Sequence, residues 1–248
     1  MNNYIIIPAR LNSSRLPNKI LLDLQGKSVI QRVYEQCRKV KGIKGVIIAV
    51  DSLKVLEHCK KFTSDVFMTD INHQSGTDRI AEVNSRIKAD IIVNVQGDEP
   101  FISPLLIEDI LAAFDKNTNM VSAMHKICTV SELLNPNVVK VVVDKNNYAM
   151  YFSRSVIPLD RDNREEIFNK KKISASPYYR HLGIYGYKSR FLKEFASWPQ
   201  TPLEQLEKLE QLRVIENGYK IKMVKSLKES LGIDTVEDYN KALTYFTQ

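Results

Sequence analysis

Short apolar runs alternate with amphipathic segments along the first half of the chain. Runs rich in Ile and Val predict strands at 4–7, 46–50, 66–68 and 91–95. Continuous apolar runs of this kind are typical of strands that are buried on both faces of a parallel sheet. Helical patterns lie between and after them, at 29–39, 53–62, 78–88 and 104–114. Strands that alternate with helices indicate βαβ units, and therefore a three-layer α/β fold with a mostly parallel sheet.

Capping residues mark the starts of several of these helices. Ser52 and Thr77 are candidate N-caps, because a hydroxyl can accept a hydrogen bond from a free backbone N–H of the first turn. Ser103 followed by Pro104 predicts an N-cap and the first helical residue.

The second half of the chain has a more mixed pattern. It predicts strands at 138–143 and 149–152 around a turn, further strands at 181–187 and 220–224, and helices at 203–216 and 236–246. The polar stretch 160–176 predicts a mobile loop. Because no repeat or low-complexity linker interrupts the chain, we expect a single domain over 1–248 with an antiparallel subdomain inserted into it.

Composition excludes several classes of protein. The chain has 248 residues, of which 44% are hydrophobic and 26% charged, as in globular rather than disordered proteins. No apolar run approaches the roughly 18 residues that a membrane span needs, and the N-terminal residues do not resemble a signal peptide. Cys37, Cys59 and Cys128 have no CxxC spacing, which favours free thiols in a reducing cytoplasm over a zinc site or a disulfide framework.

The net charge of +7 is compatible with nucleic acid, an anionic membrane or small anionic substrates as partners. The runs 38–41 and 170–172 are short, and each is more typical of a solvated face than of a binding site. Since no basic pattern interleaved with aromatic residues is present, nothing points to an RNA-binding module.

The segment 8–19 follows the first predicted strand and concentrates basic and hydroxyl side chains. In a doubly wound sheet, ligands bind beyond the carboxyl ends of the strands. Arg10, Arg15, Lys19 and Ser13 supply the groups that hold a triphosphate. The segment is neither a Walker A motif nor a GxGxxG loop. A phosphate-binding loop and a solvated basic loop are both open at this point.

A second candidate site follows the fourth predicted strand, where the sequence 94–100 reads Asn-Val-Gln-Gly-Asp-Glu-Pro. Asp98 places a carboxylate at the same edge of the sheet as the basic loop. Mg²⁺ is commonly bound by one or two carboxylates together with substrate phosphates. Alternatively, these acids cap the next helix, although Ser103 already supplies a cap.

Seven segments together resemble the family of CMP-Kdo synthetases, the 3-deoxy-manno-octulosonate cytidylyltransferases. They stand in the family's order and span nearly the whole chain: 7–10 with 14–19, 73–82, 94–100, 151–154, 180–187, 209–213 and 232–235. The resemblance implies a Rossmann-like fold of the nucleotide-diphospho-sugar transferase type. It also implies a reaction in which CTP and the sugar acid Kdo give CMP-Kdo and pyrophosphate for lipopolysaccharide biosynthesis.

The resemblance assigns roles to residues of both halves. The nucleotide-binding residues are Pro8, Ala9, Arg10, Ser13, Arg15, Lys19, Ser75, Gly76, Arg79 and Gln96. The catalytic residues are Arg10, Lys19, Asp98 and Asp234, of which the two aspartates hold Mg²⁺ as the cofactor. The sugar-facing residues are Gln96, Arg154, Arg161, His181, Tyr185, Glu210 and Gln211.

Each sugar-facing assignment has a simpler structural alternative. His181 and Tyr185 are four residues apart on a strand and share a face, which suits a pocket wall and also ordinary core packing. Glu210 and Gln211 lie on a helix whose Leu203, Leu206, Leu209 and Leu212 predict a buried stripe, so that polar neighbours would normally be at the surface.

The resemblance also implies how the chain is divided and where it acts. The nucleotide part is 1–130, the sugar-binding and dimerisation part 131–225, and the metal loop with the last helix 226–248. A cytoplasmic homodimer is expected, with CTP and Kdo as substrates and with neither nucleic acid nor a membrane as a partner.

The sequence shows two departures from the family's pattern and one residue that bears on the substrate, and three rival functions stay open. Val50 stands where the family commonly has Thr, and the approach to Asp234 lacks the family's frequent Pro. The resemblance favours Kdo over its 8-amino analogue, because the related enzymes that use the analogue carry Gln at the position of Glu99. The rivals are a CMP-sialic acid synthetase, a glycosyltransferase whose DxD motif would be 160–162, and a basic RNA-binding protein.

Overall fold

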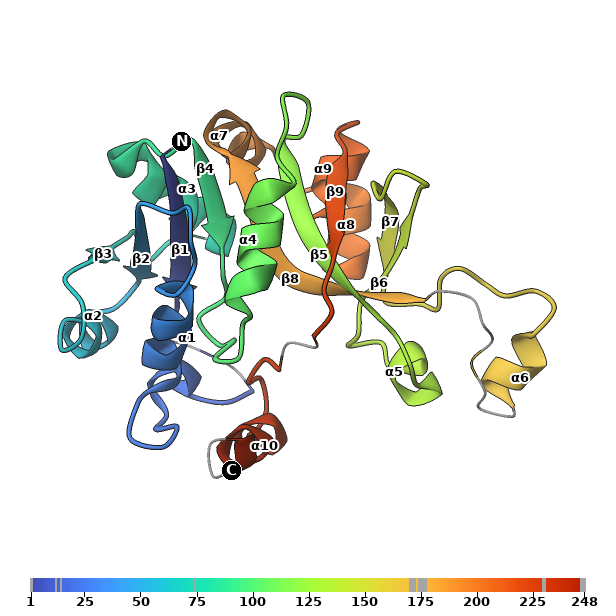
Figure 1. Cartoon of the computed structure of the whole chain (residues 1–248), viewed down its shortest axis with the longest axis horizontal. Helices are drawn as coiled ribbons and strands as arrows, with labels where there is room; N and C mark the ends of the chain where they lie inside the picture. The colour runs from blue at the N-terminus through green and yellow to red at the C-terminus, as the bar shows by residue number, and fades with distance from the viewer. Residues whose placement is uncertain are drawn as a thin grey trace. The chain divides into compact units, whose positions relative to one another are not determined.

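The computed structural model of the chain (Figure 1) describes residues 2–11, 13, 15–73, 75–169, 173, 178–228 and 231–245. Its elements, in chain order, are β1 (Asn3–Ala9), the 3₁₀ helix η1 (Lys19–Leu21), α1 (Val29–Cys37), β2 (Gly45–Val50), α2 (Leu53–Cys59), β3 (Val66–Met68), α3 (Gly76–Ile87), β4 (Ile91–Asn94), α4 (Pro104–Ala112), β5 (Met120–Lys126), α5 (Val130–Leu134), β6 (Lys140–Val143), β7 (Ala149–Ser153), α6 (Arg164–Phe168), β8 (Tyr179–Lys188), α7 (Ser189–Ser197), α8 (Pro202–Glu207), α9 (Leu212–Glu216), β9 (Ile221–Lys225) and α10 (Val236–Tyr245).

These elements form two units that are not continuous along the chain. The first unit contains residues 1–112, 184–197 and 229–248, and the second contains 113–183 and 198–228. The strand β8 therefore contributes its first half to the second unit and its second half to the first.

The first unit is built on a parallel sheet with the strand order β3-β2-β1-β4. The second half of β8 continues it as an antiparallel strand, with Lys188 opposite Ile91 and Tyr185 opposite Asn94. The expected α/β class with a mostly parallel sheet is confirmed. The three consecutive isoleucines of β1, residues 5–7, are fully buried, as expected for a strand covered on both faces.

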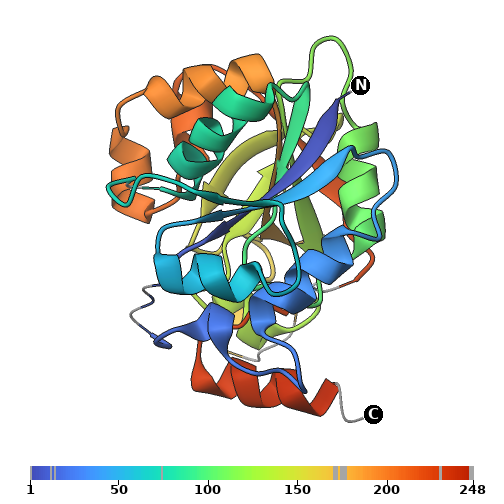
Figure 2. The same cartoon turned by 90° about the vertical axis from the view of Figure 1, so that its left-hand side faces the viewer.

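Helices cover both faces of this sheet. Figure 2 shows α3 and α7 on one face and α1 and α4 on the other. The helix α1 begins as predicted at Val29, where Ser28 caps the first turn by accepting a hydrogen bond from Gln31 N. It buries Val29, Ile30, Val33 and Cys37. This three-layer arrangement leaves the ends of the strands free to form a site.

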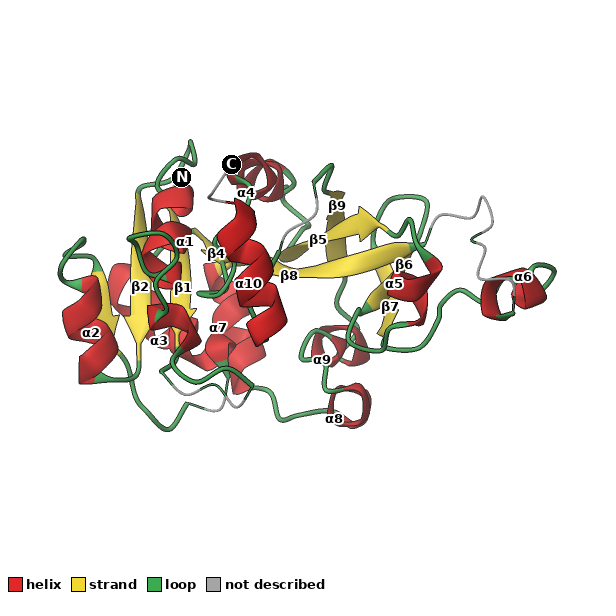
Figure 3. Ribbon diagram, turned by 90° about the horizontal axis from the view of Figure 1, so that it is seen from below, coloured by secondary structure: helices red, strands yellow, loops and turns green. Residues whose placement is uncertain are grey.

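The second unit contains the antiparallel part (Figure 3). In it β6 pairs antiparallel with β7 and with the first half of β8, while β5 pairs in parallel with β9. The hairpin of β6 and β7 agrees with the predicted strands at 138–143 and 149–152. The sequence pattern did not predict β5 and α5 of this unit, nor η1 and α7 of the first unit.

The start of α3 differs from the prediction. The N-cap is Ser75 rather than Thr77, and the helix begins at Gly76. Ser75 Oγ accepts a hydrogen bond from Asp78 N at 3.1 Å, and the Asp78 carboxylate accepts one from Ser75 N at 3.0 Å. This reciprocal capping box is more stabilising than a single hydroxyl cap, and it leaves Thr77 buried inside the first turn.

The predicted helix over 203–216 is in fact two short helices, α8 and α9. Lys208 between them adopts a left-handed conformation with φ of 55°, which ends α8. The predicted apolar stripe is also wrong at Leu206, which is 79% exposed. The buried residue of α8 is Glu204, whose carboxylate accepts hydrogen bonds from Arg213 on α9, one of them 2.7 Å long from Nε.

The polar stretch 160–176 is not wholly a loop, because it contains the helix α6. Ile167 of this helix is fully buried in a cluster with Ile127, Leu133 and Tyr178. Ile167 thus anchors the helix to the second unit, whereas the neighbouring Phe168 is exposed. The basic run 170–172 lies outside the described residues.

Across the described part of the chain, none of the helices combines the length and the apolar character that crossing a bilayer requires.

The buried pair of Glu204 and Arg213 predicts a stability experiment. Glu204→Gln removes the carboxylate that accepts both hydrogen bonds from the buried Arg213 guanidinium and leaves Glu210, 3.6 Å away, as its counter-charge. The change should lower the free energy of unfolding by about 3–5 kcal/mol. Chemical denaturation of the purified protein measures the change. The double variant Glu204→Leu/Arg213→Met removes both charges and should recover most of that loss.

The matched control is Glu35→Gln, which breaks the exposed ion pair with Lys27. Its effect should stay below about 1 kcal/mol. A loss in Glu204→Gln no larger than in this control would show that the buried pair does not hold α8 against α9.

Candidate active site

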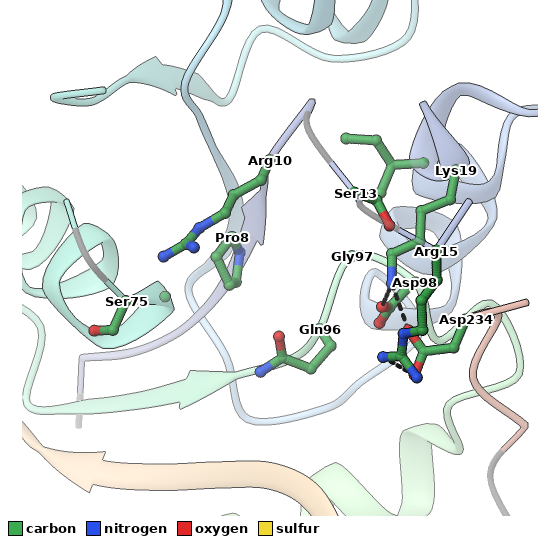
Figure 4. A pocket seen from close by; sticks show the side chains of 12 residues that line it. Pro8, Arg10, Ser13, Arg15, Lys19, Ser75, Gln96, Gly97, Asp98 and Asp234 are labelled. Atoms are coloured by element: carbon green, nitrogen blue, oxygen red, sulfur yellow. Dashed lines mark hydrogen bonds and ion pairs between the residues drawn. The ribbon is translucent and has the colours of Figure 1, made fainter. Parts of the chain in front are cut away.

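A cavity of about 430 Å³ opens at the carboxyl ends of β1 and β4, wholly within the first unit. Its lining consists of Pro8, Arg10, Ser13, Arg15, Lys19, Ile20, Ser75, Gly76, Gln96, Gly97, Asp98 and Asp234. Figure 4 shows Arg15 and Lys19 gathered on Asp98 and Asp234 at one side of it, with Arg10 and Ser75 at the other. The location is the one that the order of strands predicts for a ligand site.

Glycine is required where β4 leaves the sheet. A Cβ on Gly97 would lie 3.0 Å from Pro8 O and 3.2 Å from Ile30 Cδ1, closer than side chains tolerate. The missing side chain lets the segment after β4 pack directly against the end of β1. Gln96 and Asp98 are thereby brought beside Arg10 and the rest of the basic loop.

A backbone hydrogen bond brings the late segment to the same place. Ile233 N donates a hydrogen bond to Asp98 O at 2.9 Å. This bond holds the backbone just before Asp234 next to Asp98. Ile233 is fully buried with Leu16, Leu24 and Val29 in a cluster that α10 completes. Asp98 and Asp234, 136 positions apart in the sequence, therefore meet at one point.

The charged centre of the cavity is the ammonium of Lys19. It donates hydrogen bonds to Asp98 Oδ2 and, at 2.8 Å, to Asp234 Oδ1. Arg15 pairs with the other oxygen of Asp234 at 3.0 Å. Burial by itself lowers the pKa of Lys19, but the two carboxylates outweigh that effect and hold the pKa above its ordinary value. Lys19 is consequently a permanent cation here.

The two carboxylates fit a hard divalent cation. Both carboxylates bind the Lys19 ammonium, so the electrostatic potential between them favours a positive charge. Among the described residues there is no cluster of three or more His, Cys, Asp or Glu side chains that would make a cage on its own. Two carboxylates completed by substrate oxygens is the arrangement that Mg²⁺ prefers.

Most of the predicted nucleotide-binding residues lie together. Of the ten, eight line the cavity, and the exceptions are Ala9 and Arg79. Ala9 is fully buried in β1. Arg79 is 1% exposed and lines a neighbouring hollow of about 310 Å³ that shares Arg10 with the main cavity. Their roles toward a nucleotide stay predictions.

The predicted sugar-facing residues are divided between the units. Gln96 and Tyr185 belong to the first, and Tyr185 stacks on Tyr187 at 6.1 Å between ring centroids. In the second, His181 Nδ1 lies 3.4 Å from the amide nitrogen of Gln211.

Three further predicted residues of the second unit have their own surroundings. Glu210 pairs with Arg213 at 3.6 Å. Arg154 donates to the backbone oxygens of Glu207 and Pro136, at 2.8 and 3.1 Å, while Arg161 is exposed.

Sequence reasoning missed several residues of this region. Ile20 and Gly97 line the cavity, and Asp51 lines the neighbouring hollow. Gly97 carried a usable signal, since a glycine directly after a buried strand often marks a close backbone approach. Ser14, part of the basic loop, lies outside the described residues.

The surroundings of His181 predict a pH dependence of stability. The residue keeps some exposed surface, but its ring packs against Phe152 at 4.9 Å and its Nε2 meets Ser122 Oγ at 2.8 Å. Burial lowers the pKa of His181 to about 3. Between about pH 6.5 and 3 the unfolded chain binds a proton that the folded chain does not, so acidification through this window destabilises the fold.

The expected slope from His181 alone is about 1.4 kcal/mol per pH unit. Urea unfolding of wild type and His181→Gln between pH 7 and 4 measures it, and the variant should lose stability less steeply. His125→Gln is the matched control, because that ring also bonds within the second unit, to Ser226 O at 2.9 Å. Parallel pH profiles of wild type and His181→Gln would contradict the assignment.

Comparison with known proteins agrees with this geometry. The family described as Cytidylyltransferase matches residues 4–222. Proteins named 3-deoxy-manno-octulosonate cytidylyltransferase from Francisella tularensis and Haemophilus influenzae are each 48% identical to the chain, with 99% and 97% of it covered and 98% and 97% of their own lengths.

Solved structures show the same fold. A CMP:2-keto-3-deoxy-manno-octonic acid synthetase complexed with CTP superimposes with a TM-score of 0.91 and 38% identity, over 100% of this chain and 99% of that one. A cytidylyltransferase from Leptospira borgpetersenii, 17% identical, shares the fold with a TM-score of 0.64, over 100% of this chain and 87% of its own. The chain belongs to the family of 3-deoxy-manno-octulosonate cytidylyltransferases.

Proposed function

We propose that this protein transfers CMP from CTP to 3-deoxy-D-manno-octulosonate (Kdo), giving CMP-Kdo and pyrophosphate for lipopolysaccharide biosynthesis. The supporting observation is the basic cavity at the carboxyl edge of the sheet, in a chain 48% identical to proteins named for this reaction. The CTP complex of a 38% identical structure identifies the nucleotide that such a fold accepts.

The arrangement suits in-line transfer of a nucleotidyl group. The anomeric hydroxyl of the sugar attacks the α-phosphorus of CTP, and pyrophosphate leaves from the opposite side. Positioning and neutralisation of charge are the main contributions that a protein makes to such a step. Arg10, Arg15 and Lys19 supply three cations where the triphosphate would lie, and Ser13 supplies a hydroxyl.

Two of these cations are already paired in this structure. Lys19 and Arg15 are bound to Asp98 and Asp234, so binding of a triphosphate would exchange carboxylate contacts for phosphate contacts. In the exchange the cations leave one set of anionic oxygens for another, and Lys19 stays mostly buried. The departing pyrophosphate would then meet groups that need little reorganisation.

We assign Asp98 and Asp234 as the residues that hold Mg²⁺. When bound, this ion supplies a Lewis acid that stabilises phosphate charge and lowers the pKa of the attacking hydroxyl. Its recruitment to the two carboxylates would free Lys19 for the phosphates.

For the sugar, the candidates combine neutral and charged groups. His181, with a pKa of about 3, is neutral near pH 7 and can only donate or accept a hydrogen bond. Arg154 and Arg161 are the candidates for the sugar carboxylate. Arg161 is exposed, whereas Arg154 already donates to two backbone oxygens.

We also propose a cytoplasmic homodimer. The free thiols of Cys37, Cys59 and Cys128 suit a reducing compartment. Large apolar side chains of the second unit are exposed in the single chain, namely Met150, Leu159, Phe168 and Leu206, and a second copy would cover such surface.

The reaction is tested by pyrophosphate release. Incubation with Mg²⁺, each of the four nucleoside triphosphates, and Kdo, 8-amino-Kdo or sialic acid should give rapid release only with CTP and Kdo, and mass spectrometry should identify CMP-Kdo. Lys19→Met is the inactive control. Faster release with sialic acid or the 8-amino sugar would reassign the substrate, and no release from CTP with any sugar would refute the proposed reaction.

The metal assignment is tested with Asp98→Asn and Asp234→Asn. Each should lower turnover about a hundredfold or more, because several kcal/mol of charge stabilisation are lost. Each should also weaken binding of Mn²⁺ in the presence of CTP, measured by electron paramagnetic resonance. The exposed Asp109 on α4 provides the control Asp109→Asn, which should bind Mn²⁺ as the wild type does. Unchanged Mn²⁺ binding in both site variants would exclude these aspartates as ligands.

A further inference from the structure

One carboxylate links the two walls of the nucleotide cavity without lining it. Asp51 follows β2, directly beside the end of β1, because Ala9 and Val50 are the last paired residues of the two strands. Asp51 Oδ1 accepts a hydrogen bond from Leu11 N at 3.0 Å. This bond fixes the backbone one residue beyond Arg10, where the phosphate-binding loop leaves the sheet.

The second oxygen of Asp51 faces a buried cation. Arg79 NH2 lies 3.6 Å from Oδ2, and the Arg79 side chain is only 1% exposed. The same guanidinium donates to Thr69 Oγ1, and Thr69 is itself held by two hydrogen bonds of 2.9 Å to Val50 O. The Asp51 carboxylate is therefore held in place by Arg79, which is buried and is itself bonded to the buried Thr69.

Arg79 belongs to the helix whose first residues form the opposite wall. Ser75 and Gly76 begin α3 and line the main cavity, one turn before Arg79. The path from α3 through Arg79 and Asp51 to Leu11 thus sets the position of the loop relative to the helix. Asp51 also stands near two guanidiniums, since Arg10 and Arg79 line the same small hollow, and its charge offsets their repulsion.

We propose that Asp51 is a positioning residue for CTP binding, which acts by holding the Leu11 amide and with it the backbone that presents Arg10 to the phosphates. Arg79 serves as the buried counter-charge that keeps Asp51 in place. The inference rests on the proposed function in that CTP is the ligand, but it concerns binding and not the chemical step.

Asparagine and alanine at position 51 separate the two interactions of the carboxylate. Asp51→Asn keeps an oxygen that can accept from Leu11 N, whereas Asp51→Ala removes it. Isothermal titration calorimetry with CTP in the absence of sugar should show about tenfold or more weaker binding for Asp51→Ala than for Asp51→Asn. Arg10 is intact in both variants.

The buried Arg79 could prevent either single variant from folding, so the pair is repeated without that charge. Asp51→Asn/Arg79→Met and Asp51→Ala/Arg79→Met both lack the ion pair, and they differ only in the acceptor for Leu11 N. Their melting temperatures should be similar, while the alanine variant should again bind CTP about tenfold more weakly. A merely structural role would lower stability and leave this ratio at one.

Asp23→Ala is the matched control, because that carboxylate also accepts from a backbone N–H of the first unit, Gly26 N at 2.8 Å, and lines neither hollow. It should bind CTP as the wild type does. Equal CTP affinity of the Asn and Ala variants in both backgrounds, or an equal loss in Asp23→Ala, would overturn the positioning role. A wild-type chain that binds CTP but releases no pyrophosphate with Kdo would refute the proposed reaction alone, and a chain that binds no CTP would refute both.

Discussion

The candidate site depends on one ammonium group. Lys19 joins carboxylates that are 79 and 215 residues away along the chain. Two carboxylates at one point would repel each other, so the site as folded needs a cation between them. That requirement explains why the basic loop, the end of β4 and the segment before α10 converge.

Packing supports this electrostatic centre from behind. The absence of a side chain at Gly97 brings the end of β4 against Pro8, and the cluster around Ile233 holds the segment before α10. A site of charged side chains thus keeps its geometry because its backbone is fixed by buried apolar contacts and by one hydrogen bond, Ile233 N to Asp98 O.

The parallel half of the fold was predictable because its strands are buried on both faces, so that their sequences are continuous apolar runs. The predicted strand at 66–68 has the observed bounds, and the helix predicted from 29 begins there. In the predicted helix over 203–216, tertiary contacts outweighed the hydrophobic periodicity. Glu204 is buried because Arg213 pairs with it, and Lys208 takes a left-handed conformation, neither of which periodicity records. The basic loop and Asp98 were found from their places after predicted strands, Ser75, Gly76 and Asp234 were found by family motifs, and Ile20 and Gly97 were missed. Asp51 was not found, because its role arises from a contact with a backbone amide 40 positions away.

The distance along the chain between the partners of Lys19 has a consequence for synthesis. On the ribosome, Arg10, Arg15 and Lys19 emerge more than two hundred residues before Asp234. For that interval Lys19 has at most one of its two carboxylate partners, and the first unit cannot close around α10. The charged centre of the cavity is therefore completed only after the last segment of the chain has been synthesised.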